Sequence, residues 1–211
     1  MSSLTFIFGP VSSGKTIQLI TQAHQIRQIH GKNYIKLMKP GFDTRYGYNK
    51  IKSASGLEIE ADFIINNNDS IAKLNIESHS YLLVDEIQFF TVGQIYELHK
   101  LSIEKDVHIE CFGLLKDFRN NLFQASAKLL ELADKIVPVF AFCFLCSKHK
   151  LDCNQKNATY NMKIISNGDK IVPTIDGASK ECGGIEKYIP VCSKCYYIAF
   201  KSIEVQSCDR S

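Results

Sequence analysis

The sequence has no long apolar run, no internal repeat and no low-complexity segment. Its first apolar run, LTFIF at 4–8, is five residues long. A secretory signal needs a longer apolar region, and a transmembrane helix needs about 20 apolar residues. We therefore expect a cytoplasmic protein with no membrane partner.

An excess of charge of one sign is also missing, because the formal net charge is only +3 over 211 residues. So small a total does not indicate a dedicated nucleic-acid-binding protein, although a local basic patch would leave such binding open. We expect no nucleic-acid partner. The hydrophobic content of 45% is enough for a packed core and excludes a wholly disordered chain. The length predicts one or two domains.

A glycine-bounded loop, GPVSSGKT at 9–16, follows the first apolar run directly. Its spacing is G-x-x-x-x-G-K-[ST], in which backbone N–H groups surround a phosphate chain, the lysine reaches the outer phosphates and the hydroxyl binds Mg²⁺. A chance match is the alternative, but the loop lies between an expected strand and an expected helix, as the mechanism requires. The predicted nucleotide-binding residues here are Gly9, Ser12, Ser13, Gly14, Lys15 and Thr16.

Strand and helix patterns alternate over the first 140 residues or so. Strands are expected at 4–8, 33–38, 80–86, 107–113 and 135–142, with weaker short strands within 53–64. One helix should follow the loop and end at Gly31, a second should begin after Thr91 as N-cap, and a third should start near Leu122. The apolar residues assigned to the buried faces of the last two include Val92, Ile95, Leu98, Ile103, Leu122, Ala125, Leu129, Leu132 and Ala133.

This alternation predicts an α/β domain over residues 1–141, with a mostly parallel, RecA-like P-loop sheet and helices on both faces. The run YLLVDE ends in two acids at the carboxyl edge of such a sheet, where ligands bind. In P-loop NTPases an aspartate at this place holds Mg²⁺, which assigns Asp85 to the metal. A helix cap or a solvated acid pair is the alternative, and it is weakened by the intact loop at 9–16.

Adjacent side chains on a strand point to opposite faces, so Asp85 and Glu86 should have different roles if the strand continues through them. A carboxylate near the γ-phosphate can orient a hydroxyl or a water and accept its proton. With water as the acceptor the protein would be an ATPase, and with a hydroxyl it would be a kinase. The residues considered so far do not decide between the two.

Four of the eight cysteines form two C-x-x-C pairs, and these are Cys143, Cys146, Cys192 and Cys195. Four thiolates match the tetrahedral preference of structural zinc, and a reduced intracellular thiol more often binds metal than forms a disulfide. A redox pair and a replacement ligand from His149 or Cys153 are the alternatives. Residues 142–200 are therefore expected to form a small zinc-binding domain, followed by a tail at 201–211.

Within that small domain we expect no helix with a clear apolar face, and we interpret YYIAF at 196–200 as a strand. Cys111 and Cys182 are expected to be buried free thiols.

The segments FGPVSSGKT, FDTRY, VDEIQFF, GLLKDFRNNLF, FCFLC and GGIEKYIPVCSKCYY, in this order, resemble the type II thymidine kinases, which are P-loop deoxynucleoside kinases with a zinc lasso domain. The resemblance covers nearly the whole chain. It implies ATP- and Mg²⁺-dependent phosphorylation of thymidine, and of deoxyuridine, at the 5′-hydroxyl, in nucleotide salvage for DNA synthesis. It also implies structural Zn²⁺, a homotetramer and feedback inhibition by thymidine triphosphate.

The resemblance also implies roles for single residues. Glu86 would be the catalytic base, and Arg45 would offset the charge of the transferred phosphoryl group. The substrate-binding residues implied are Asp43, Phe89, Leu114, Phe118, Phe123, Thr159 and Tyr188. Core packing is the alternative for the phenylalanines, and a surface or subunit contact is the alternative for Tyr188.

The chain departs from the family pattern at a few positions. Val11 stands where a longer residue is common, and Tyr160 and Asn161 stand where a basic residue is common, so the resemblance implies no phosphate contact at these two positions. Glu181 and Cys182 replace more apolar residues at the rim of the expected thymine pocket.

A different class remains possible from the residues alone, namely a nucleic-acid-dependent P-loop ATPase with a zinc ribbon. Convergence of Phe118, Phe123 and Tyr188 beside Glu86 would favour a small nucleoside, whereas an open basic groove lined by these rings would favour a polymer. A catalytically silent binding module is the third alternative, and the intact Lys15, Asp85 and Glu86 argue against it.

Overall fold

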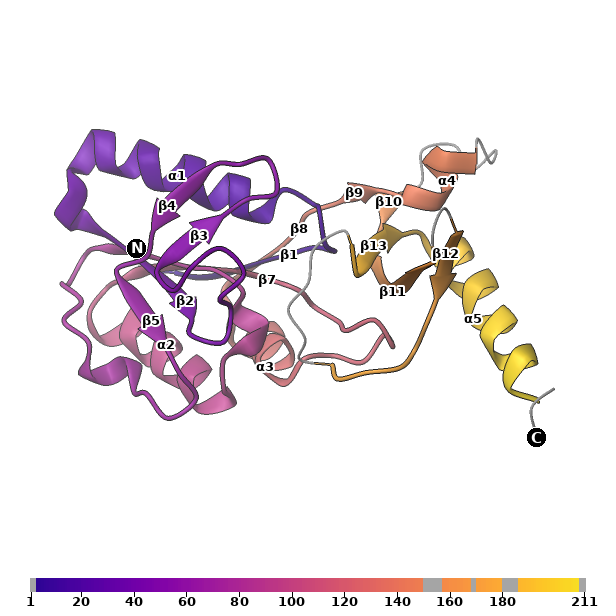
Figure 1. Cartoon of the computed structure of the whole chain (residues 1–211). Coiled ribbons are helices and arrows are strands. Elements are labelled where there is room, and N and C mark those ends of the chain that lie inside the picture. Colours follow the sequence, from indigo (N-terminus) through magenta and orange to yellow (C-terminus); the bar gives the residue numbers. More distant parts are fainter. Residues whose placement is uncertain (1–2, 150–156, 168–169, 180–185, 209–211) are drawn as a thin grey trace. The chain divides into compact units, whose positions relative to one another are not determined.

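The computed structural model describes residues 3–149, 157–167, 170–179 and 186–208 (Figure 1). The chain divides into two compact units. The sheet unit comprises Met1–Phe8, Gly14–Leu115 and Leu122–Val139, and the cysteine unit comprises Gly9–Ser13, Lys116–Asn121 and Phe140–Ser211. Two short segments, 9–13 and 116–121, thus pack with the cysteine unit although the sequence around them belongs to the sheet unit.

The sheet unit is built on a six-stranded parallel sheet with the strand order β5-β2-β6-β7-β1-β8. Its strands are β1 (Leu4–Phe8), β2 (Ile35–Pro40), β5 (Phe63–Ile65), β6 (Tyr81–Val84), β7 (His108–Gly113) and β8 (Lys135–Pro138). The strands read as near-continuous apolar runs because both faces of the sheet are covered. β7 separates β1 from β6, so one strand lies between the phosphate loop and the acidic pair.

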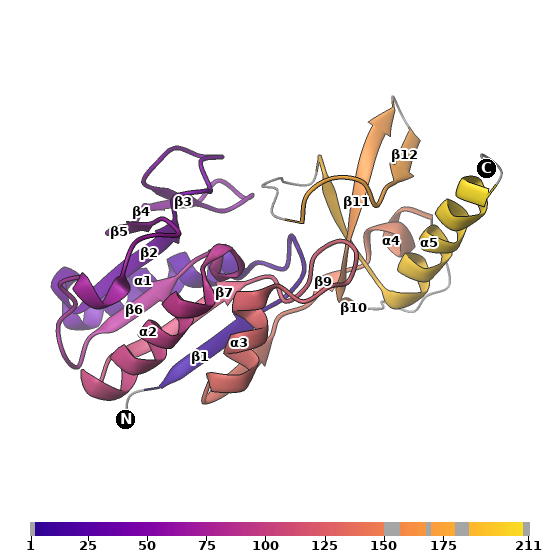
Figure 2. The same cartoon turned by 90° about the horizontal axis from the view of Figure 1, so that it is seen from below.

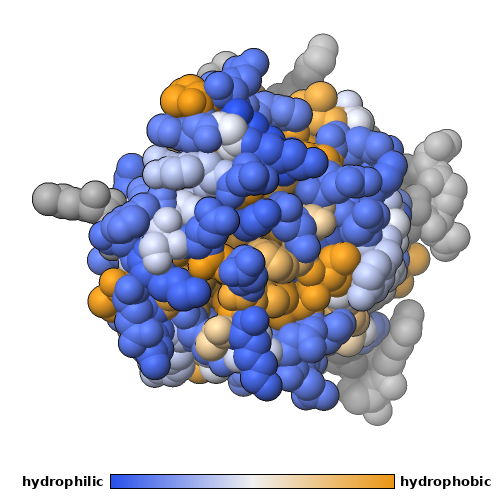
Figure 3. Space-filling view, turned by 90° about the vertical axis from the view of Figure 1, so that its left-hand side faces the viewer, coloured by the Kyte–Doolittle hydropathy of each residue, from blue (hydrophilic) through white to orange (hydrophobic). Residues whose placement is uncertain are grey.

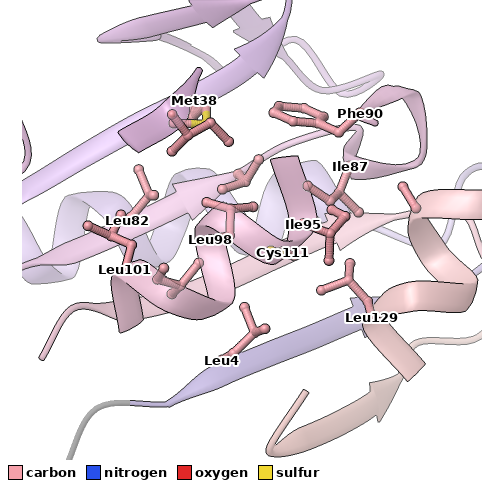
Figure 4. Close-up of a cluster of buried hydrophobic side chains, with 14 of the residues drawn as sticks. Leu4, Met38, Leu82, Ile87, Phe90, Ile95, Leu98, Leu101, Cys111 and Leu129 are labelled. Atoms are coloured by element: carbon pink, nitrogen blue, oxygen red, sulfur yellow. The ribbon is translucent and has the colours of Figure 1, made fainter. Parts of the chain in front are cut away.

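Helices cover both faces of this sheet, as the alternation predicts (Figure 2). On one face α1 (Lys15–His30) buries Leu19, Ile20, Ala23 and Ile26. On the other face α2 (Val92–Glu104) and α3 (Gln124–Leu132) pack over a larger apolar cluster, part of which is shown in Figure 4. The predicted P-loop α/β fold is confirmed.

Short elements join the main ones. These are η1 (Lys32–Tyr34), the antiparallel hairpin of β3 (Lys50–Lys52) and β4 (Glu58–Glu60), η2 (Ile71–Lys73) and η3 (Ile87–Phe89). The predicted N-cap of α2 is confirmed, because the Thr91 hydroxyl accepts the Gln94 N–H and the Gln94 side chain accepts the Thr91 N–H. This reciprocal pair satisfies two donors that the start of a helix leaves open.

Some predictions of buried residues and of strand ends are wrong. Ile103 was assigned to the buried face of α2, but its side chain is 64% exposed, and Leu122 precedes α3 and is also exposed. The strand expected at 135–142 is two strands, β8 and β9 (Ala141–Phe142), because β9 leaves the large sheet and pairs with β10 (Asn157–Ala158). An apolar run alone does not show where a chain changes partners.

The cysteine unit combines β9, β10 and a three-stranded antiparallel sheet of β12-β11-β13 with two helices. The remaining elements are α4 (Phe144–His149), β11 (Tyr160–Asn167), β12 (Lys170–Pro173), β13 (Tyr188–Val191) and α5 (Ser193–Cys208). The expectations of no helix with a clear apolar face and of a strand at 196–200 are therefore wrong, because α5 covers this segment. Tyr196 and Ala199 are buried and three positions apart, which is the spacing of one helical face.

In the ranges that the structure describes, no helix is long and apolar enough to cross a membrane. Figure 3 shows one face of the molecule, on which apolar residues gather within a hydrophilic surround. Apolar areas of this kind are often used for association between chains. The homotetramer remains a prediction.

Candidate active site and metal centre

The phosphate loop turns into α1 at Gly14, whose φ of 83° lies in the left-handed region. This conformation is easily adopted by glycine and strained for other residues. Lys15 is the first residue of α1, so the backbone N–H groups of the first helical turn lie next to the loop in the sequence. Such a helix start attracts anions, and phosphate groups in particular.

The charges of Lys15, Asp85 and Glu86 influence one another. Lys15 is only partly exposed, and desolvation of its ammonium group lowers its pKa to about 8, although the charges of Glu86 and Asp85 oppose this shift. Burial raises the pKa of Asp85 to about 7, and the neighbouring charge of Glu86 adds to the shift. The Thr16 hydroxyl donates to Asp85 over 3.5 Å. The hydroxyl and the carboxylate are oxygen ligands of the kind that Mg²⁺ prefers.

The alternation argument for Asp85 and Glu86 required the strand to continue through them, and this condition is not met. The strand β6 ends at Val84, so strand alternation does not extend through the two acids. Glu86 instead adopts φ 49° and ψ 42°, a left-handed conformation that is uncommon for a residue with a side chain. The two carboxylates have different partners, Thr16 for Asp85 and both Arg45 and Gln88 for Glu86.

Arg45 lies between two carboxylates. Its Nε and Nη2 donate to Asp43 Oδ1 and Oδ2 over 2.8 and 2.9 Å, and Nη2 also donates to Glu86 Oε1 over 2.5 Å. Burial alone would raise the pKa of Asp43, but hydrogen bonds and charge from Arg45, together with Lys39, hold it below its ordinary value. Burial alone would lower the pKa of Arg45, and the two carboxylates instead raise it. Three residues predicted from the sequence are thus brought together.

Lys39 supports the loop that carries Asp43 and Arg45, and the sequence analysis missed it. Its side chain is 2% exposed, and Nζ donates to the carbonyl oxygens of Asp43 over 2.6 Å and Lys50 over 3.0 Å. Lysine is almost never fully buried unless it is paired. A lysine at the end of the apolar strand IKLMKP was the available signal.

Gln88 was also missed. It is 1% exposed, and it links Glu86 to the backbone of Leu114 through both ends of its amide. The segment VDEIQFF contains it, but nothing in the local pattern distinguishes a glutamine that faces Glu86 from one that faces solvent.

The predicted aromatic residues form two pairs, one in each unit. In the sheet unit, Phe89 and Phe123 meet edge to face with ring centroids 6.4 Å apart. In the cysteine unit, Phe118 and Tyr188 lie 6.1 Å apart, and cationic groups of Arg119 and Lys163 lie over the Phe118 ring. Thr159 is exposed in the cysteine unit, and its N–H donates to Val191 O over 3.2 Å.

Hydrogen bonds fasten the two inserted segments to the cysteine unit. Asn161 Oδ1 accepts the Val11 N–H over 2.8 Å, while Asn161 Nδ2 donates to Lys116 O over 3.1 Å. The Tyr196 hydroxyl donates to Phe118 O over 2.8 Å. Asn161, which departs from the family pattern, thus uses its amide to hold protein backbone.

The predicted four-cysteine cluster is present. The Sγ atoms of Cys143, Cys146, Cys192 and Cys195 all lie within 4.8 Å of one another and are buried. Cys146 Sγ is 3.8 Å from Cys192 Sγ and 3.5 Å from Cys195 Sγ. A tetrahedral site with Zn–S bonds of about 2.3 Å separates its sulfurs by about 3.8 Å. The four thiols therefore fit a structural metal ion.

Cys111 belongs to the apolar core of the sheet unit, which confirms that it is a buried free thiol. Burial, together with the charge of Glu110, raises the pKa of its thiol. The expectations for Cys153, Glu181 and Cys182 lie outside the described residues, as does any account of the His149 side chain.

The parallel sheet, the glycine loop after β1 and the acid after β6 define a P-loop α/β protein. The sequence model of a family described as "Thymidine kinase" matches residues 2–196. A thymidine kinase from Streptococcus pyogenes serotype M3 is 37% identical over 199 residues, 93% of this chain and 98% of the relative. One from Enterococcus faecalis is 34% identical and is covered over 95% of its length. The chain belongs to the thymidine kinase family.

Proposed function

We propose that the protein transfers the γ-phosphoryl group of ATP to the 5′-hydroxyl of thymidine, in nucleotide salvage for DNA synthesis. The observation that carries this proposal is the Asp43–Arg45–Glu86 group beside Lys15 and Asp85, in a chain of the thymidine kinase family. One carboxylate is available for a hydroxyl proton, and one guanidinium is available for a phosphoryl group.

The loop at 9–16 would hold the phosphates, with Gly9, Ser12, Ser13, Gly14 and Lys15 around them. Thr16 and Asp85 would hold the Mg²⁺ ion, which supplies positive charge to the β- and γ-phosphates when it is bound. Burial leaves the ammonium of Lys15 weakly solvated in the free protein and thereby lowers its pKa to about 8. Anionic phosphates would favour its charged form and would themselves be bound more strongly in this poorly solvated place.

Glu86 would accept the proton of the 5′-hydroxyl as the new oxygen–phosphorus bond forms and the bond to the β-phosphate oxygen breaks. ADP and the nucleoside monophosphate are the products. Arg45 would face the transferred phosphoryl group, and its two bonds to Asp43 keep the guanidinium in one orientation while it does so. A permanent cation held in this way stabilises charge that develops in the transition state.

The substrate side would be formed by Asp43, Phe89, Leu114 and Phe123 in the sheet unit and by Phe118, Thr159 and Tyr188 in the cysteine unit. Aromatic faces suit a flat pyrimidine ring. Deoxyuridine lacks only the methyl group, and one hydrophobic carbon discriminates by about 10- to 200-fold. We therefore expect deoxyuridine to be a slower substrate.

The four cysteines would bind Zn²⁺, which leaves no position for water and so acts on structure and not on chemistry. A homotetramer, feedback inhibition by thymidine triphosphate and a cytoplasmic location belong to the same proposal.

A phosphate-transfer screen over the natural nucleosides tests the proposal, with zinc measured on the same sample. We expect thymidine to give its monophosphate with one ADP per turnover and about one zinc ion per chain. The alternative is tested by adding single-stranded DNA in place of nucleoside. ATP turnover that responds only to DNA would favour the nucleic-acid-dependent ATPase and would overturn the kinase.

A further inference from the structure

We infer that Gln88 is a positioning residue that sets the orientation of the Glu86 carboxylate, and that position 113 is a glycine so that Gln88 can occupy its place. The inference rests on the proposed role of Glu86 as proton acceptor and assigns the support on which that role depends.

The amide of Gln88 is fully engaged. Its Nε2 donates to Glu86 Oε2 over 2.5 Å, and its Oε1 accepts the Leu114 N–H over 2.9 Å. Because a backbone N–H can only donate, the oxygen must face Leu114 and the NH₂ group must face Glu86. The orientation of this amide is therefore dictated by its partners.

The two oxygens of Glu86 consequently have separate donors. Arg45 Nη2 donates to Oε1, and Gln88 Nε2 donates to Oε2. Arg45 would be engaged by phosphate during turnover, whereas Gln88 is fixed to the protein by its other end. Gln88 is thus the donor that can hold the carboxylate throughout the reaction.

The backbone of Glu86 needs such support. Its left-handed conformation is unfavourable for a residue with a side chain and persists only where the surroundings enforce it. The turn continues directly into η3, whose residues Ile87, Gln88 and Phe89 are all buried. Gln88 ties this turn to the residue that follows β7.

Gly113, the last residue of β7, has no room for a side chain. A Cβ atom there would lie 2.5 Å from Gln88 Oε1 and 2.7 Å from Ile87 Cγ2, far inside contact distance. Its φ is outside the left-handed region, so backbone conformation does not require glycine here. Glycine is required here because Gln88 and Ile87 pack closely against position 113.

The first test is Gln88→Glu. A carboxylate keeps an oxygen for the Leu114 N–H but replaces the donor to Glu86 with a repelling acceptor. Loss of one charge-assisted hydrogen bond predicts a fall in kcat of about 10- to 100-fold with the thymidine KM changed by less than about 3-fold. A merely structural role would lower the amount of folded enzyme, measured by melting temperature and zinc content, without lowering kcat per folded molecule.

The matched control is Gln94→Glu. Gln94 is the other buried glutamine of this region, and its amide accepts the Thr91 N–H and donates to Asn66 O and Asp69 O. Its replacement changes a buried amide to a carboxylate away from Glu86, so kcat per folded molecule should stay within about 2-fold of the wild type. Should Gln88→Glu not fold, Gln88→Met removes the donor with a neutral side chain of similar size.

The second test is Gly113→Ala, alone and combined with Gln88→Met. If position 113 is a glycine to leave room for Gln88, Gly113→Ala lowers kcat by displacing the Gln88 side chain. The kcat losses of the two substitutions are then not multiplicative, because Gln88→Met has already removed the amide that Gly113→Ala would displace. Multiplicative losses, or a wild-type kcat in either Gln88 variant, overturn the inference. Full turnover by Glu86→Gln instead overturns the proposed role of Glu86, and the two failures are thereby distinguished.

Discussion

The sheet unit and the cysteine unit are each stabilised internally in a different way. The sheet unit buries large apolar side chains on both faces of its sheet, including Phe6, Leu82, Phe112 and several isoleucines. The core of the cysteine unit is smaller, and four of its buried residues are the clustered cysteines. A small core rarely stabilises a domain unless a metal or a cross-link is added. The comparison predicts that the two units respond differently to the same treatment.

The boundary between the units falls within the loop at 9–16. Lys15, Arg45, Asp85 and Glu86 belong to the sheet unit, whereas the segments 9–13 and 116–121 pack with the cysteine unit. The groups proposed for the chemistry thus have a stable scaffold. The first half of the phosphate loop depends on a unit that we expect to need a metal.

Metal removal should have the largest effect. Structural zinc contributes about 10 to 16 kcal/mol in small domains, so Cys146→Ser or a strong chelator should unfold the cysteine unit while the sheet unit stays folded. Hydrogen exchange followed by mass spectrometry would show loss of protection in β11 and β13 and retained protection in β1 and β7. Simultaneous loss of protection in both units would contradict the expected difference between them.

Asn161→Ala tests whether the cysteine unit supports nucleotide binding. It removes the acceptor of the Val11 N–H and the donor to Lys116 O. Two lost hydrogen bonds of about 1 kcal/mol each predict a rise in the ATP KM of roughly 10- to 30-fold. Asn157→Ala, at an exposed position of β10, is the control. Equal KM values for both variants would contradict the assigned support.

The pH dependence of nucleotide binding tests two residues of the sheet unit, Lys15 and Asp85. In the proposed site Mg²⁺ would need the ionised Asp85, whose pKa is about 7, so protons should compete with the ion below that pH. The phosphates would need the protonated Lys15, whose pKa is about 8 in the free protein, so affinity should decline above that pH. We expect the Mg·ADP affinity to be highest between about pH 7 and 8 and to fall by up to about tenfold per pH unit outside this window. Calorimetric titration at a series of pH values measures it, and in Asp85→Asn the acidic decline should become shallower.

Cys111→Ala should have the smallest effect and sharpens the contrast with Cys146. Cys111 lies in the apolar core of the sheet unit, so its truncation should cost about 1 kcal/mol of stability. Zinc content and kcat should be unchanged. A loss of zinc from this variant would mean that the metal depends on more than the four clustered thiols.

Much of the fold could be predicted because the sheet unit follows local rules. Buried parallel strands, a glycine loop and the Thr91 cap are all visible in short windows. Predictions failed where local patterns were ambiguous. YYIAF fits a strand by composition, but it lies within the helix α5, which begins at Ser193. Tyr196 and Ala199 of this helix belong to the apolar core of the cysteine unit.

The candidate site was predictable in its charged residues and not in their supports. Arg45 and Glu86 lie in recognisable motifs, and the structure pairs them at 2.5 Å. Lys39 binds the backbone carbonyl of Lys50, and Gln88 binds the backbone N–H of Leu114, which are contacts that the local sequence does not reveal. Gln88 also reaches Glu86, and it does so only because the backbone turns at Glu86. The left-handed conformation of Glu86 itself depends on tertiary packing, so no sequence pattern reveals it.

The most direct test of the central claim is the turnover of Glu86→Gln with thymidine and Mg·ATP, alongside its affinity for Mg·ADP. Loss of a general base predicts a kcat reduced by about 10²- to 10⁴-fold, with nucleotide affinity and zinc content close to those of the wild type. A variant that phosphorylates thymidine at the wild-type rate would contradict the account, because no proton acceptor would then be needed at Glu86.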